Sequence, residues 1–262
     1  MTFWEHLEEL RRIIFRSLIA VFVLMIVVFM GKSILFDKII FAPISSDFFL
    51  YRWIDSLLAL FGLTKLDQFS LELVNIDLAA QFFTHVKISF YVALIVAMPY
   101  IFYLLWGFIR PALYDVEKQK TKAAFAMASV LFFAGVLVGY GLIFPFTLRF
   151  LGTYQVSVAV PNQISLQSYI SMFSSLILIM GVVFEMPTLA MILSKLGIIN
   201  REMMQKYRRH AFVILLIAAA IITPSGDAFT LALVTMPLYL LYEVSIRLTQ
   251  KKKVEENNDS DQ

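Results

Sequence analysis

The sequence predicts an all-α integral membrane protein in which six transmembrane helices form a concave bundle, with both ends of the chain in the cytoplasm. Hydrophobic residues make up 60% of the 262 residues, and the mean hydropathy is +0.79, more apolar than ordinary soluble domains. The charged residues, 16% of the chain, are clustered between long apolar runs. Together these observations predict a membrane protein.

Six apolar segments are long enough, or nearly long enough, to cross a hydrocarbon core of ~30 Å. They cover residues 13–31, 86–109, 123–148, 166–193, 211–223 and 228–246. The mixed charges before the first run, and its length, predict a retained span and not a signal peptide. We expect residues 1–248 to form a single transmembrane domain, and the polar, acidic residues 249–262 to be a disordered cytoplasmic tail.

The distribution of lysine and arginine predicts the orientation of the spans. Most basic residues lie in the N-terminal segment, in loops 110–122 and 194–210 and in the tail, whereas the opposite loops hold only five: Lys32, Lys38, Arg52, Lys65 and Arg149. By the positive-inside rule, the first set of segments is cytoplasmic.

The last two spans are predicted to be short. The fifth is bounded by His210 and Pro224, so that about 13 apolar residues cover about 20 Å. Pro237 interrupts the sixth. We expect this pair either to thin the bilayer locally or to tilt against its neighbours, and a re-entrant hairpin is the alternative.

Residues 32–80 form the one long segment outside the predicted spans. Apolar residues from Phe48 to Phe61 recur at helical spacing, which is typical of a short helix lying on the membrane surface or capping the spans. Residues 69–77 alternate imperfectly and are expected to be extended.

Several classes of function are excluded. The net charge of +3 is too small to indicate nucleic-acid binding, and the chain has no cysteine. Motifs of nucleotide hydrolysis, zinc proteolysis and acyl transfer are absent. His6 and His210 are predicted to lie on the opposite side of the membrane from His85, so we expect no metal site, no cofactor and no enzymatic activity.

Two cytoplasmic segments carry carboxylates. In the N-terminal helix, Thr2 and Glu5 have the spacing of a capping box, and Glu8, Glu9, Arg11 and Arg12 follow on its polar face. That face is either a solvated surface with internal ion pairs or part of a binding site.

The 110–122 loop contains Asp115 and Glu117, close to Trp106 and Phe108. These carboxylates are either counter-ions or a recognition site, because a carboxylate accepts a guanidinium in a directional two-bond fork. Two carboxylates on two cytoplasmic elements would suit a ligand with adjacent arginines.

Glu185 lies inside the fourth predicted span, beside Pro187. An ionisable residue at such a depth is costly and marks a functional site by default. The alternative is a neutral glutamate that braces a proline kink.

Polar and proline landmarks along nearly the whole chain resemble those of the TatC family of twin-arginine protein export. Most specific are HLEELR at residues 6–11 and WGFIRPALY at 106–114, followed by Glu117. The match continues through FAP at 41–43, FFT at 82–84, FP at 144–145, FEMP at 184–187, TP at 223–224 with Asp227, and PLY at 237–239.

The resemblance implies a receptor that recognises twin-arginine signal peptides. With single-span TatA-type and possibly TatB-type partners, it would export folded proteins across the inner membrane, driven by the proton-motive force. The resemblance assigns Glu9, Arg11, Phe108 and Glu117 to signal-peptide binding, Glu185 and Pro187 to a groove that meets a partner's transmembrane helix, and Pro43 and Asp227 to loop structure or assembly. It also implies self-association in a multi-subunit complex within the lipid bilayer.

Three rival functions stay open on the sequence. A small-solute or ion-coupled transporter would use Glu185 as a proton or cation site. An intramembrane enzyme lacks a recognisable set of catalytic residues, and a scaffold would not need the cytoplasmic glutamates.

Overall fold

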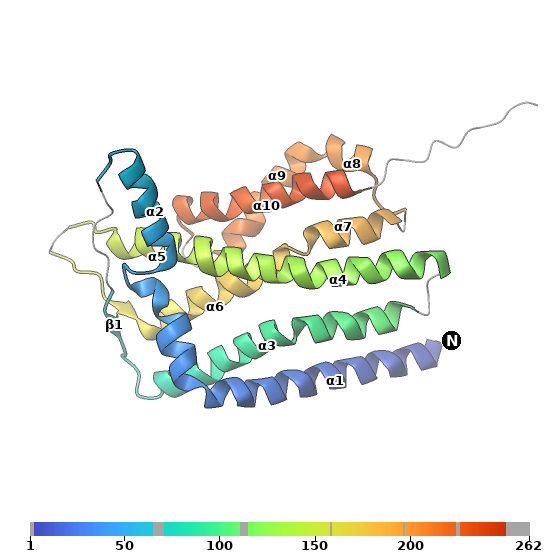
Figure 1. Cartoon of the computed structure of the whole chain (residues 1–262), viewed down its shortest axis with the longest axis horizontal. Coiled ribbons are helices and arrows are strands. Elements are labelled where there is room, and N and C mark those ends of the chain that lie inside the picture. Colours follow the sequence, from blue (N-terminus) through green and yellow to red (C-terminus); the bar gives the residue numbers. More distant parts are fainter. Residues whose placement is uncertain are drawn as a thin grey trace, which may run out of the picture.

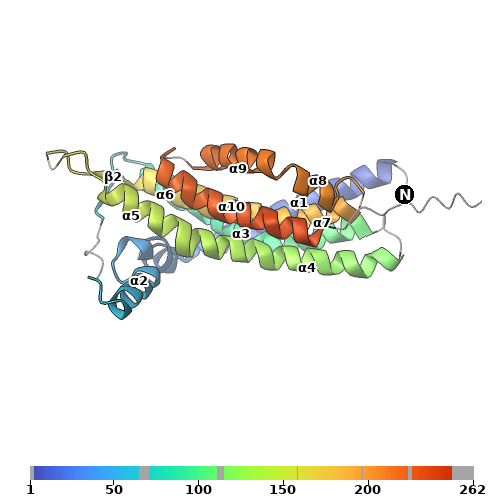
Figure 2. The same cartoon turned by 90° about the horizontal axis from the view of Figure 1, so that it is seen from above.

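The computed structural model is an elongated bundle of helices with a cap of short elements across one end (Figures 1 and 2). It describes residues 3–64, 71–110, 115–157, 159–195, 197–223 and 226–249; the predicted capping residue Thr2 and most of the predicted tail lie outside this part. The elements along the bundle are α1 (Phe3–Met30), α3 (Ala80–Ile109), α4 (Asp115–Val138), η4 (Gly139–Ile143), α5 (Phe144–Thr153), α6 (Leu166–Val183), α7 (Met186–Lys195), α8 (Arg201–Lys206), α9 (Arg208–Ile222) and α10 (Ala228–Leu248). We call the end at which α1 begins the N end, and the opposite end the cap end.

Five helical stretches are long and apolar enough to cross a membrane. They are Trp4–Met30, Ala80–Ile109, Ala124–Thr153, Leu166–Lys195 and Ala228–Leu248. The third joins α4, η4 and α5, and the fourth joins α6 and α7. These stretches agree with five of the six predicted spans. The second begins earlier than expected, because the helix already includes the polar residues Gln81, Thr84 and His85 that precede the apolar run.

The fifth predicted span corresponds to α9, which has only 15 residues, or about 22 Å of helix. With 21 residues, α10 is also shorter than the other four long stretches, as predicted. However, Pro237 lies inside α10 without ending it, so the sixth span is one continuous helix.

Helix α1 packs on α3 at one edge of the bundle (Figure 1). Val21 is buried against Ala93 and Ala97, whose small side chains let the two helices approach. Most other apolar residues of α1, such as Phe22 and Val27, are exposed, as expected for a helix whose outer face meets lipid. The larger hydrophobic core lies on the other side of α3, among α4, α6, α7 and α10.

The cap consists of η1 (Ile34–Ile40), η2 (Ala42–Ile44), α2 (Phe49–Leu60) and a two-stranded parallel sheet. The helix predicted after Phe48 is therefore confirmed, and it forms part of the cap. In the sheet, β1 (Leu73–Val74) pairs with β2 (Ile164–Ser165). Extended structure was expected near β1, but its pairing with a distant loop was not.

Three tyrosine hydroxyls attach the cap by donating to backbone carbonyls. Tyr140 donates to Ile39 over 2.9 Å, and Tyr169 donates to Ile40. Tyr51 of α2 lies 3.3 Å from the carbonyl oxygen of Pro43 and 3.0 Å from that of Pro145. Burial raises the pKa of Tyr51 to about 12, which the positive charge of Arg149 partly opposes, so this hydroxyl keeps its proton at neutral pH.

Candidate functional site

Two helices, α1 and α4, extend polar turns beyond their apolar stretches at the N end. Helix α1 is 28 residues long, about 42 Å, which exceeds the ~30 Å core. Because its predicted apolar run begins at Ile13, the turns that carry Glu8 and Glu9 project past the core. The C-terminal end of α3 and the polar beginning of α4 lie at the same end (Figure 1).

The first turns of α1 contact the last turn of α3. The ring of His6 stacks on that of Phe108, with a centroid distance of 4.1 Å and an interplanar angle of 22°. Since Glu9 and Ile13 follow His6 by three and seven residues, all three lie on one face of the helix. Ile13 is buried, so this face is turned toward α3, and Glu9 is the carboxylate nearest to the α3 side.

The charges of α1 form short-range ion pairs. Glu8 lies 3.7 Å from both Arg11 and Arg12, while Glu9 lies 3.4 Å from Arg12. The side chain of Glu9 is 38% exposed, against 58% for Glu8 and 71% for Arg11. Arg12 is thus the guanidinium that reaches Glu9, a neighbour that the sequence pattern did not single out.

Glu117 belongs to the first turn of α4, which begins five residues after Arg110. Its side chain lies outside the described part of the structure. The backbone of this turn follows the end of α3 directly and lies at the same end of the bundle as Glu9 (Figure 1). Phe108 is partly buried, and in the sequence it lies between the two acidic segments.

Glu185 lies at a break between two helices. Helix α6 ends at Val183, α7 begins at Met186, and Pro187 is the second residue of α7, where its missing N–H is not needed by the helix. Glu185 is only 8% exposed. Within the described residues, neither Oε1 of Glu185 nor Oγ1 of Thr188, one turn later, has a hydrogen-bond partner.

Two glycines, Gly135 of α4 and Gly139 of η4, allow these elements to pack closely against α6 and the break. Neither glycine was predicted as a functional residue. A Cβ on Gly135 would lie 2.4 Å from the carbonyl oxygen of Met180 and 2.8 Å from Cβ of Phe184. A Cβ on Gly139 would lie 3.1 Å from Cα of Ile177. The G-x-x-x-G spacing of Gly135 and Gly139 was the available signal, because small residues one turn apart allow membrane helices to approach closely.

Pro43 and Asp227 both have structural contacts. Pro43 is buried in η2, and its carbonyl oxygen lies within reach of the Tyr51 hydroxyl. Asp227 is the N-cap of α10: its carboxylate accepts a hydrogen bond of 2.7 Å from the backbone N–H of Thr230.

Acidic and histidine side chains do not gather into a metal site in the part of the chain that the structure describes: no group of three or more metal-ligating residues occurs there. His6 lies at the N end, while His85 lies at the cap end, in the second turn of α3. At the N end, the carboxylate of Glu9 and the stacked rings of His6 and Phe108 lie on the side of α1 that faces α3.

Comparison with known proteins identifies relatives across almost the whole chain. Residues 5–237 match the family described as Sec-independent protein translocase protein (TatC). A protein named Sec-independent protein translocase protein TatC from Blattabacterium sp. (strain BPLAN) is 38% identical, and the match covers 97% of each chain. The protein of the same name from Deinococcus radiodurans is 33% identical, with 96% of this chain and 86% of the relative covered.

The fold is also similar to a solved structure. The crystal structure of a twin arginine translocase receptor, TatC, in DDM superposes with a TM-score of 0.75 at 32% identity. The match covers 94% of this chain and 99% of the other.

Proposed function

The chain belongs to the TatC family of Sec-independent protein translocase proteins, and we propose that its N end is the surface on which a twin-arginine signal peptide binds. The chain is a multi-pass membrane protein and the receptor component of a twin-arginine translocase. As predicted, this makes it a transport protein and not an enzyme.

The observation that carries the proposal is the position of Glu9. Its carboxylate lies on the face of α1 that turns toward α3, on the same face as His6, which stacks on Phe108. Its neighbour Arg12, 3.4 Å away, contributes at most about 0.5 kcal/mol at such an exposed site. A guanidinium of the cargo can therefore displace Arg12 and form a stronger two-bond fork with Glu9.

Glu117 is proposed to take the second arginine of the signal peptide. The polar turns of α1 and α4 project from the same end of the bundle (Figure 1), and the peptide would extend from one to the other across the end of α3. Phe108 would cover the aliphatic parts of the arginine side chains. Arg11, which pairs with Glu8, would help to orient the N-terminal helix.

The basic residues support a cytoplasmic N end in an inner membrane. Arg11, Arg12, Arg110, Lys195 and the pair Arg208 and Arg209 all lie at or near this end of the helices. By the positive-inside rule this end faces the cytoplasm. Both termini, and the predicted signal-peptide site, would then lie on the side where folded cargo waits for export.

Glu185 is proposed to contact the transmembrane helix of a single-span TatA-type or TatB-type partner. Its buried oxygen and that of Thr188 lack partners among the described residues, and buried polar groups are normally hydrogen-bonded. A polar group on a partner helix would satisfy them within the bilayer. Such binding would couple cargo recognition to translocation driven by the proton-motive force in a multi-subunit complex.

The first test replaces Glu9 by Gln and measures binding of a fluorescent twin-arginine peptide to the detergent-purified protein by anisotropy. Loss of a charge-assisted contact at this half-covered position should cost about 1–2 kcal/mol, or about five- to thirty-fold in Kd. Glu8→Gln is the matched control, because it removes the same charge from a more exposed neighbour. Equal Kd values for the two variants would contradict the proposed site.

The second test replaces Glu185 by Leu, which removes the buried carboxylate, including its unpartnered Oε1, at similar side-chain size. We expect the signal-peptide Kd to stay within about twofold, because α7, about 15 Å of helix, separates Glu185 from the N end, while crosslinking to the partner helix and export decrease by about tenfold or more. Glu9→Gln serves as the reciprocal control. Wild-type crosslinking and export in Glu185→Leu would leave this glutamate a purely structural role.

A further inference from the structure

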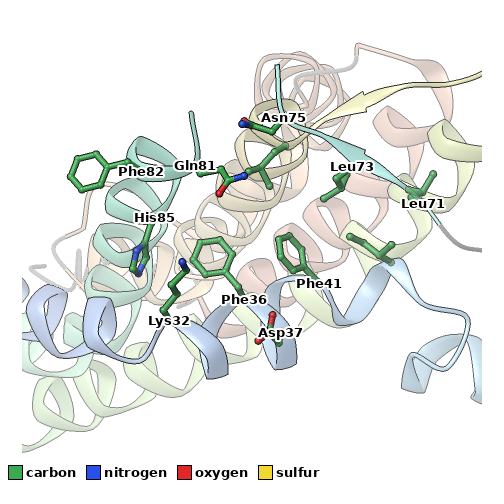
Figure 3. A pocket seen from close by; sticks show the side chains of 12 residues that line it. Lys32, Phe36, Asp37, Phe41, Leu71, Leu73, Asn75, Gln81, Phe82 and His85 are labelled. Carbon is green, nitrogen blue, oxygen red and sulfur yellow. The ribbon is translucent and has the colours of Figure 1, made fainter. Parts of the chain in front are cut away.

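A cavity of about 680 Å³ opens at the cap end (Figure 3). It is bounded by the segment that follows α1, by the first turns of α3 and by the strand β1. Its volume is within the range of about 300–1,000 Å³ that is usual for small-molecule sites. None of the contacts proposed above for signal peptide or partner involves this cavity.

One side of the cavity is polar. Lys32, Gln81, His85 and Asn75 lie along it, and the ammonium group of Lys32 is close to the His85 ring (Figure 3). Lysine, glutamine and asparagine side chains all present N–H donors. A surface of converging donors with a lysine is suited to a phosphate group.

The opposite side is apolar. Phe41 from the segment after α1, and Leu71 and Leu73 from the strand side, line this part of the cavity, while Phe36 lies at the boundary beside Lys32 and His85 (Figure 3). A free phosphate would leave these side chains without a partner. The separation of donors from apolar side chains matches an amphiphile, with a phosphate at one end and hydrocarbon at the other.

His85, on the polar side of the cavity, is fixed in place by packing against neighbouring rings. Its side chain is only 9% exposed, and its ring stacks on Phe29 with a centroid distance of 3.9 Å. It also meets the ring of Phe36 edge-on at 5.5 Å. Its Nε2 has no hydrogen-bond partner among the residues that the structure describes, which is unusual for a buried nitrogen.

The cavity lies at the level expected for lipid headgroups. Lys32 follows the end of α1 by two residues, and Gln81 is the second residue of α3, so both mark the ends of apolar stretches. Headgroups occupy the zone just outside the hydrocarbon core, so a lipid phosphate can reach Lys32 from the bilayer.

We propose that this cavity binds a phospholipid of the cap-end leaflet. Its phosphate would lie against Lys32 and Gln81, beside His85, and the upper part of its hydrocarbon would lie against Phe36, Phe41 and Leu73. The exposed carboxylate of Asp37, also in the lining, would favour a headgroup that carries a cationic amine next to the phosphate. This site is separate from the peptide site and does not depend on it.

The test is lipid binding to the delipidated, detergent-purified full chain, titrated with phosphatidylethanolamine and followed by native mass spectrometry. We expect Lys32→Gln to weaken binding about tenfold, as expected for loss of a charge-assisted contact. Lys38→Gln is the matched control: it removes the same charge from the same exposed segment, at a position that does not line the cavity. Equal affinities of these two variants would overturn the proposal.

Two further arms identify the source of the ligand and its location. Inorganic phosphate at millimolar concentration should not compete, and full competition would show a simple anion site instead of a lipid site. A phospholipid with a photoreactive group near the phosphate should label peptides within 31–44 and 71–85. Labelling confined to other helices would also overturn the proposal. Lys32 is exposed, so both lysine variants should retain wild-type thermal stability.

Discussion

Replacing Gly135 by Ala tests whether the approach of α4 to α6 sets the position of the break at Glu185. The new Cβ would lie 2.4 Å from the carbonyl oxygen of Met180, whereas carbon–oxygen contacts normally begin at about 3.3 Å. Because the obstacle is backbone, it cannot move aside as a flexible side chain would. The two helices must separate locally by up to about 1 Å.

The expected magnitude combines two opposing effects. Forcing an extra methyl group into a packed interface costs about 1–3 kcal/mol, while replacing a helical glycine by alanine contributes up to about 1 kcal/mol of stability. Gly107→Ala measures the gain in helix propensity without the packing cost, because a Cβ at this helical glycine of α3 meets nothing within 4 Å. The difference in free energy of unfolding between the two variants should therefore be about 1–3 kcal/mol, with Gly135→Ala the less stable.

The assay is equilibrium unfolding in mixed detergent–SDS micelles, followed by far-UV circular dichroism. Gly107→Ala should unfold at the same SDS fraction as the wild type or a higher one, and Gly135→Ala at a lower one. If Gly135→Ala matched Gly107→Ala, the close approach would not limit the packing, and the explanation for the position of Glu185 would fail. A selective loss of export in Gly135→Ala, with intact peptide binding, would link the packing of α4 on α6 to the proposed partner contact at Glu185.

Two further changes address the ends of α9 and α10. Asp227→Ala removes the carboxylate that accepts a hydrogen bond from the N–H of Thr230. It should lower the free energy of unfolding by about 1 kcal/mol, measured in the same micelles. Asp227→Asn retains an acceptor and should recover most of this stability. Arg208→Gln breaks the 2.9 Å ion pair with Glu243 that joins α9 to α10. A double-mutant cycle with Glu243→Gln should give a coupling energy of about 0.5–1 kcal/mol. A coupling energy of zero would mean that α9 is held by apolar packing alone.

The spans were predictable because each depends on local composition. The runs before Met30 and Ile109 are apolar over about the length of a bilayer, and the shortness of α9 follows from the polar residues around His210 and the proline at 224. The number of apolar residues in each run is visible without any knowledge of neighbours. Proline was a weaker guide, since Pro187 marks a break between helices while Pro237 lies within a continuous one.

The features that were not predicted depend on contacts between distant segments. Pairing of Leu73 with Ile164 requires two loops to meet at the cap end, and nothing local in either loop specifies this partner. Similarly, the roles of the arginines in α1 depend on which face of the helix meets α3. The acidic and aromatic candidates could be found from their type and spacing, but the pairing of Arg12 with Glu9 required the geometry.

The attachment of the cap has a consequence for how this protein can change in evolution. The hydroxyls of Tyr140 and Tyr169 donate to backbone carbonyl oxygens, which every amino acid carries, so a substitution at the exposed Ile39 leaves its hydrogen bond possible. A single inserted residue would instead displace the chain by about 3.3 Å and take both oxygens out of reach. Related chains should therefore conserve the length of this segment more strictly than the residue type at its exposed positions, such as Ile39.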